Sequence, residues 1–173
     1  IGSFSQSGET DTAYIEPLIK QDPRINLISP QGLSDIRVIL ANGKIISAML
    51  RVPSQASNGK ANLHQGAIGV AVDTETGRTT NAMHKGSVIH HHPDTRAALI
   101  DVDIPHWTRI KEMARSSYDA VPLAYLGVDI CLDEVLGPLV LEVNGRAGLE
   151  IQNIHQTGFK NELFHAIEGG LTK

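Results

Sequence analysis

The sequence predicts an α+β domain built on a mainly antiparallel sheet with flanking helices. Apolar runs rich in β-branched residues occur in neighbouring pairs, and short turn-forming segments separate the members of each pair. Only two segments carry apolar residues at helical spacing. The resulting order of strands, helix, hairpin and helix differs from the regular alternation of strands and helices that builds a parallel sheet.

The chain begins with a segment that we interpret as a linker. Residues 1–11 are polar and rich in serine and glycine, as loops are. Residues 12–20 form a short strand-like run, but Pro17 cannot donate a main-chain hydrogen bond within a sheet. We therefore expect residues 12–20 to form an edge strand or an extended crossing segment, and residues 12–173 to form the folded domain.

Two hairpins are predicted in the first half of the domain. Apolar runs at residues 35–40 and 44–51 flank the dipeptide Asn42-Gly43, which favours the tight turn of a two-residue hairpin loop. Runs at residues 67–73 and 78–84 have the same character and a polar, glycine-containing connection. Both pairs therefore predict antiparallel strands.

Two helices are predicted in the second half. Residues 105–119 carry apolar side chains at helical spacing, and Pro105 suits a first helical turn. Residues 161–168 predict a short amphipathic helix, which we expect Gly169-Gly170 to end. Residues 87–101 are expected to be irregular.

A third predicted hairpin carries the strongest candidate site. It consists of apolar runs at residues 124–132 and 138–144. Glu142 and Asn144 are two residues apart and so point to one face, and antiparallel pairing could bring Asp129 beside them. Their oxygen atoms suit Mg²⁺ held jointly with phosphates. The alternative is a polar face of a two-stranded ribbon, but burying Asp129 in its apolar run is costly unless a cation compensates the charge.

Two arginines and one loop are candidates for binding an anion. Arg37 and Arg51 lie in paired strand-like runs, and a guanidinium group matches phosphate oxygens. The alternative is two solvated sheet arginines, with Asp35 as a partner. The polar segment 52–66 is either a mobile loop or a functional one, and main-chain N–H groups at residues 62–66 could hold an anion.

Histidines and the single cysteine offer weaker candidates. His90, His91 and His92, with His84 and His106, suggest zinc, but three consecutive side chains cannot face one point from regular structure. A histidine-dependent metal hydrolase is therefore the weakest hypothesis. We interpret Cys131, which lies in an apolar run, as a core residue.

Composition argues against several classes of partner. The net charge of −4 gives no global basic field, which disfavours nucleic-acid binding. No apolar run approaches the roughly 20 residues of a membrane-spanning helix. One cysteine allows no internal disulfide and fits a reducing compartment, so we expect a cytoplasmic protein without a membrane partner.

Several motifs, in this order, resemble the ATP-grasp superfamily and in particular its alpha-L-glutamate ligases, near the ribosomal-protein glutamate ligases. They are DIR at 35–37, AMLR at 48–51, ANLHQG at 61–66, LGVDI at 126–130 and GPLVLEVNGRAGLEIQ at 137–152. Residues 56–70, followed by HHPDT at 91–95, are similar to the subgroup called alpha-L-glutamate ligase homologues.

The resemblance implies the C-terminal lobe of an ATP-grasp fold, with the N-terminal lobe and its phosphate-binding lysines missing from this chain. ATP-grasp enzymes phosphorylate a carboxylate with ATP, and an amine then attacks the acylphosphate to form an amide. We therefore expect part of a ligase for small-molecule or peptide carboxylates and amines, with glutamate implied only by the subgroup. The chain alone should be inactive or very weak. The alternative is a non-catalytic nucleotide-binding or regulatory module.

The resemblance also assigns roles to individual residues. The magnesium (or manganese) ligands would be Asp129, Glu142 and Asn144. Arg37 and Arg51 would contact phosphate and stabilise the transferring group. The residues around ATP would be Asn62, His64 and Gly66 over the phosphates, and Glu16, Pro17, Leu18 and Ile19 beside the adenine.

Overall fold

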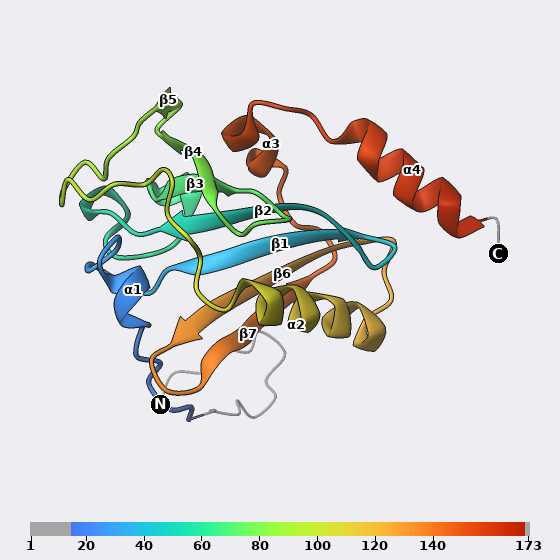
Figure 1. Cartoon of the computed structure of the whole chain (residues 1–173), viewed down its shortest axis with the longest axis horizontal. Helices are drawn as coiled ribbons and strands as arrows, with labels where there is room; N and C mark the ends of the chain where they lie inside the picture. The colour runs from blue at the N-terminus through green and yellow to red at the C-terminus, as the bar shows by residue number, and fades with distance from the viewer. Residues whose placement is uncertain (1–14, 172–173) are drawn as a thin grey trace, which may run out of the picture.

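A computed structural model describes residues 15–171 of the chain, so the predicted linker at residues 1–11 lies outside the described part. The centre of the fold is a seven-stranded sheet in the order β5-β4-β3-β2-β1-β6-β7 (Figure 1). Every neighbouring pair of strands is antiparallel. The predicted α+β class with a mainly antiparallel sheet is therefore confirmed.

The strands include the three predicted hairpins. Their bounds are β1 Asp35–Ala41, β2 Lys44–Val52, β3 Ile68–Val72, β4 Thr79–His84, β5 Ser87–Val88, β6 Tyr125–Asp133 and β7 Gly137–Asn144. The turn between β1 and β2 places both Asn42 and Gly43 at positive φ, 44° and 75°. These angles explain why the Asn-Gly dipeptide was a reliable signal for this hairpin.

The helices are distributed over both faces of the sheet. Their bounds are α1 Pro23–Asn26, α2 Trp107–Ala120, α3 Glu150–His155 and α4 Lys160–Leu171, with 3-10 turns η1 Gln55–Ser57 and η2 Leu63–Gln65. Helix α2 packs on one face, whereas α3 and α4 contact strands on the other (Figure 1).

Alternation along β1 shows how the sequence fills two cores. Val38 and Leu40 belong to the core under α2, and Ile39 belongs to the core under α3. Since a strand turns successive side chains to opposite faces, covering both faces requires a nearly continuous apolar run. Asp35 and Arg37 interrupt this run on the α3 face, and they mark the site described below.

Several sequence expectations are corrected by the structure. Of the two alternatives for residues 12–20, the edge strand is wrong for residues 15–20, which form no strand, and the first pairing along the chain is a single bridge between Gln21 and Asp133. Helix α4 continues through Gly169-Gly170 to Leu171, because glycine near a helix end costs only about 1 kcal/mol relative to alanine. The short helices α1 and α3 were not predicted, since four and six residues are too few for a clear periodic pattern.

The segment between β2 and β3 is ordered by local caps. Ser54 and Ser57 exchange hydrogen bonds in a capping box around η1, and Asn62 caps η2 by accepting the N–H of His64 at 3.0 Å. This loop is therefore held in one shape beside the sheet. Within residues 15–171, no helix is long and apolar enough to cross a membrane.

Candidate active site

Strand register gathers four charged side chains on the face of the sheet that α3 covers. Asp35 pairs with Arg51 across β1 and β2, and Arg37 pairs with Asp129 across β1 and β6. Residues directly opposite one another share a face of the sheet. The hairpin pairing of β1 with β2 thus brings Arg37 and Arg51 close together, as predicted.

A bulge adds Glu142 to the same face. The register between β6 and β7 shifts between Asp129 and Ile130, so that Asp129 faces Glu142 while Ile130 faces Val140. Leu141 is the extra residue. Without this bulge Leu141 would face Asp129 and Glu142 would point to the opposite side, because a one-residue shift exchanges the faces of a strand.

Asp129 is buried, and two arginines bind it. Arg37 donates from Nε to Oδ1 at 2.8 Å and from Nη2 to Oδ2 at 2.7 Å. Arg51 donates from Nη2 to Oδ2 at 2.7 Å, and its Nε donates to Asp35 Oδ1. The positive charge that compensates the buried carboxylate of Asp129 thus comes from two guanidinium groups. This arrangement corrects the physical argument that a buried Asp129 needs a metal ion, and the metal-binding role of Asp129 stays a prediction.

Burial shifts the ionisation of two members of this cluster. Desolvation raises the pKa of Asp35 to about 6, against the opposing attraction of Arg51. The pKa of Arg51 is raised overall. Burial acts to lower it, but the nearby carboxylates of Asp35 and Asp129 have the larger combined effect. Arg51 is therefore a permanent cation, whereas Asp35 titrates close to neutral pH.

The cluster forms the floor of a cleft of about 570 Å³, which we call the site cleft. Among the charged groups that line it, four are acidic (Asp35, Asp129, Glu142 and Glu150) and three are basic (Arg37, Arg51 and Lys60). Nη1 of each arginine makes no hydrogen bond to the residues that the structure describes, and neither does the exposed carboxylate of Glu142. The cleft thus offers free N–H donors and one free carboxylate.

The predicted phosphate loop lies at the rim of this cleft. Asn62 and His64 line it, and Gly66 ends η2 with a φ of 99°. The carbonyl oxygen of Gly66 accepts hydrogen bonds from Ser54 Oγ at 2.8 Å and from His84 Nε2 at 3.1 Å. These bonds fix the loop in place, while its role in binding ATP stays a prediction.

Neither Asn144, which shares a face of β7 with Glu142, nor the predicted adenine segment lines the site cleft. Asn144 faces Gly127, and its Oδ1 accepts the N–H of Arg146 at 2.8 Å within the turn after β7. Residues 16–19 are largely exposed and line none of the site cleft, although Lys20 next to them donates its N–H to Asp133. The predicted roles of Asn144, Glu16, Pro17, Leu18 and Ile19 remain predictions.

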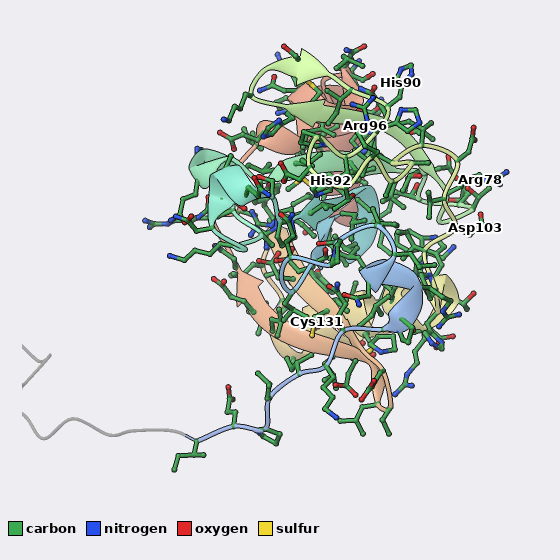
Figure 2. The ribbon with its side chains drawn as sticks, turned by 90° about the vertical axis from the view of Figure 1, so that its left-hand side faces the viewer. Arg78, His90, His92, Arg96, Asp103 and Cys131 are labelled. Atoms are coloured by element: carbon green, nitrogen blue, oxygen red, sulfur yellow. The ribbon has the colours of Figure 1, made fainter. Side chains whose placement is uncertain are left out.

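Histidine and cysteine side chains have structural contacts. His92 is buried with Nε2 2.9 Å from the carbonyl oxygen of Pro53, and Figure 2 shows His90 and His92 well away from Cys131. Burial raises the pKa of Cys131 to about 11, so its thiol stays protonated. Over residues 15–171, no group of three or more His, Cys, Asp or Glu side chains is arranged to hold a metal ion. The predicted magnesium site differs from such a group, because one of its three ligands is the asparagine Asn144.

The oxygen donors of the cleft fit a magnesium ion in type. Glu142 has a free carboxylate, and Asp129 Oδ1 accepts one hydrogen bond, which leaves it one further lone pair. An acidic majority in the lining also repels a polyphosphate unless a divalent cation accompanies it. Glu142 and Asp129 are thus the described residues best suited to hold such an ion.

A family model matches nearly the whole chain. It describes sugar-transfer associated ATP-grasp proteins and covers residues 1–168. The chain belongs to this family. The ATP-grasp superfamily predicted from the motifs is therefore confirmed, while the alpha-L-glutamate ligase subgroup stays a prediction.

Solved structures of ATP-grasp ligase PsnB are similar to this ATP-grasp chain. The complex with minimal precursor matches at 16% identity and a TM-score of 0.45, over 80% of this chain and 35% of that chain. The complex with a phosphomimetic variant of minimal precursor, Mg and ADP matches at 16% identity and a TM-score of 0.43, over 81% and 33%. The chain thus spans about a third of the PsnB length. A comparison with curated proteins gave no match.

Three residues of the site escaped the sequence argument. Asp35 was considered only as a partner for a solvated arginine, whereas it is buried in the cluster. Lys60 and Glu150 come from a loop and from the unpredicted helix α3, and both line the site cleft. An isolated charged residue carries no periodic signal. All three lie within segments that resemble the ATP-grasp superfamily, at 35–37, 56–70 and 137–152, but the resemblance assigned them no role.

Proposed function

We propose that this chain is the C-terminal lobe of an ATP- and magnesium-dependent carboxylate–amine ligase, with glutamate as one candidate substrate. The observation that carries the proposal is the cluster of Arg37, Arg51 and Asp129 beside the free carboxylate of Glu142 on the floor of one cleft. Membership of the ATP-grasp family supports the nucleotide.

The residues of the cleft have distinct tasks under this proposal. Bound ATP and Mg²⁺ would supply the phosphoryl group that activates the carboxylate. Asp129 and Asp35 hold the two guanidinium groups in the cleft lining, and their Nη1 donors, which have no partner among the described residues, would stabilise developing charge on phosphate oxygens. Glu142 would hold the divalent cation. Fixed groups of this kind act by positioning and electrostatics, which dominate phosphoryl transfer.

The charge of the cleft also supports a missing partner lobe. With more acidic than basic groups in its lining, the site cleft lacks the cationic excess needed to hold a polyphosphate alone. We propose that an N-terminal lobe in the parent protein supplies it, and that the 173-residue chain alone does not turn over ATP. The proposed cytoplasmic location rests only on the single cysteine.

One observation favours a second function. Both carboxylate oxygens of Asp129 already accept hydrogen bonds from arginines, which weakens it as a metal ligand. A lobe with this fold, in which the two arginines and two aspartates of the cluster neutralise one another, would serve as a non-catalytic nucleotide-binding or regulatory module. The two functions differ in whether ATP is consumed.

The deciding experiment measures ADP release by the full-length parent protein with Mg²⁺ and a panel of amino acids as carboxylate and amine. We expect an acid–amine pair to stimulate ADP release, and Glu142→Gln and Asn144→Ala to lose at least about a hundredfold in rate, since each removes a ligand of the cation. Glu112→Gln, on the exposed side of α2, is the matched control. Nucleotide binding without turnover by any pair would support the regulatory module, and absence of nucleotide binding would exclude both functions.

A further inference from the structure

A second and larger cleft adjoins the site cleft. It has a volume of about 910 Å³ and lies between η2, β3, the turn from β4 to β5, and α3; we call it the α3 cleft. Leu63, His64 and Glu150 line both clefts. A molecule bound in the α3 cleft can therefore reach the arginine cluster at this junction.

Specific contacts fix the wall that α3 forms. A Cβ at Gly69 would collide with Ile154, so glycine at this position lets α3 settle directly on β3. Asn81 Nδ2 donates to the carbonyl oxygen of Ile154 at 2.7 Å, and His155 Nε2 lies 2.8 Å from the carbonyl oxygen of Ala48. The cleft is thus pre-formed, as ligand sites usually are.

The lining combines apolar side chains with polar ones from α3 and the turn after it, and it carries charged side chains at two places. Leu63 and Met83 line it as part of the core under α3. Lys85 lies in the turn from β4 to β5 and lines the α3 cleft but not the site cleft. No residue in the described part of the chain pairs with its ammonium group. Glu150 lies at the junction with the site cleft, where its Oε1 is 3.7 Å from His64 Nε2.

This separation of charge gives a direction to a bound molecule. An amine is attracted to Glu150, next to the arginine cluster, and an anionic group is attracted to Lys85, away from it. A polyphosphate is disfavoured here, because one lysine would face it together with the carboxylate of Glu150. The cleft therefore suits a molecule with an amine at one end, an anionic group at the other end, and between them a chain that contacts both apolar and polar side chains.

We propose that the α3 cleft binds the amine substrate of the ligation, with its amine at Glu150 and His64 and its carboxylate or phosphate at Lys85. This assignment rests on the proposed ligase function. It accounts for the junction of the two clefts, since the amine would meet the activated carboxylate above Arg37 and Arg51.

The test uses NMR titration of the ¹⁵N-labelled 173-residue chain without nucleotide. The probes are 6-aminohexanoate, hexanoate and hexylamine, with 6-aminohexylphosphonate to separate a carboxylate from a phosphate preference. We expect 6-aminohexanoate to shift the amide signals of Lys85 and of α3 and to bind more tightly than either single-charge probe. Equal affinity of the phosphonate would show that the site recognises charge alone.

Charge-neutral variants assign the two ends. Lys85→Gln should weaken binding of 6-aminohexanoate about three- to fivefold and bring it to the level of hexylamine, and Glu150→Gln should bring it to the level of hexanoate. Lys44→Gln and Glu112→Gln, which lie outside both clefts, should change nothing. Both tested side chains are solvent-accessible, so the variants are expected to fold.

Two outcomes would overturn the proposal. One is signal shifts confined to residues outside the α3 cleft, and the other is equal affinity for 6-aminohexanoate, hexanoate and hexylamine. Either result leaves the ligase function standing, because the assay contains no nucleotide. Conversely, if the probes bind in the α3 cleft but the parent protein never consumes ATP, the cleft is a binding site and the ligase function is excluded.

Discussion

At the scale of single residues, the site is a set of buried charges that neutralise one another. Asp129 is shared by two arginines, and Asp35 holds the second of them. Removing one member leaves an opposite charge buried without its partner, which typically costs about 3–5 kcal/mol. The exposed Glu142 is different, because water already solvates it. Its loss should affect ligand binding and leave folding unchanged.

Asp35 gives a prediction for the pH dependence of stability. Its pKa is about 6 in the folded state against an ordinary value of 3.8 for an aspartate, so the folded state binds more protons between these values. The free energy of unfolding therefore falls as pH rises from about 4 to about 6, by roughly 2 kcal/mol from this group. Asp35→Asn lacks this titration, so its stability relative to wild type should rise by that amount between about pH 4 and pH 7.

Urea denaturation of both proteins at several pH values measures this difference, and Asp119→Asn on the exposed side of α2 serves as control. A difference that stays constant with pH would contradict the raised pKa. A change of opposite sign would show that attraction by Arg51 outweighs burial.

At the scale of secondary-structure elements, two local features shape the site. The bulge in β7 turns Glu142 toward Asp129. The close approach of α3 to β3 at Gly69 forms the wall of the α3 cleft.

The contact between Gly69 and Ile154 is open to a double-mutant cycle. Gly69→Ala should destabilise the chain by about 1–3 kcal/mol, because the added methyl group overlaps the Ile154 side chain. Ile154→Val, which shortens that side chain, should by itself cost about 1 kcal/mol. In the double variant the cost of alanine at position 69 should be smaller, because the nearer of the two overlapping atoms, Ile154 Cδ1, is gone. This difference gives a favourable coupling energy in urea denaturation. Simple additivity of the two changes would show that α3 is free to move away from β3.

At the scale of the whole molecule, one edge of the sheet remains open. Strand β7 is the last strand of the sheet among the described residues (Figure 1), and Leu141 within it is 46% exposed. The preceding turn exposes Val135 and Leu136, at 80% and 60%. Apolar side chains beside an unpaired strand edge favour association with another chain.

We therefore predict that the isolated chain self-associates through this edge. Light scattering should show a mass that increases with protein concentration. The double variant Val135→Lys, Leu136→Lys should shift the protein toward monomer, because two ammonium groups oppose pairing at the edge. Val121→Lys, at the end of α2, is the control and should not change the mass. A strictly monomeric wild-type chain would exclude this prediction.

The sequence by itself determined the fold class, the three hairpins, the long helix and the superfamily. Hairpins such as β1–β2 were predictable because local turn chemistry, at Asn42-Gly43, and alternation along each strand both act over short distances. The pairing of Arg37 and Arg51 on one face followed from the same short-range rules.

The tertiary structure decided how the charges are shared. The sequence could not show that Asp129 binds two arginines, since partners 92 and 78 residues away meet only through sheet pairing. It also could not show the bulge that selects Glu142 or the helix α3 that adds Glu150, because both depend on packing between distant segments. The motifs pointed to Arg37, Arg51, Asp129 and Glu142, whereas long-range register and burial fixed the contacts among the first three and the ionisation of Arg51.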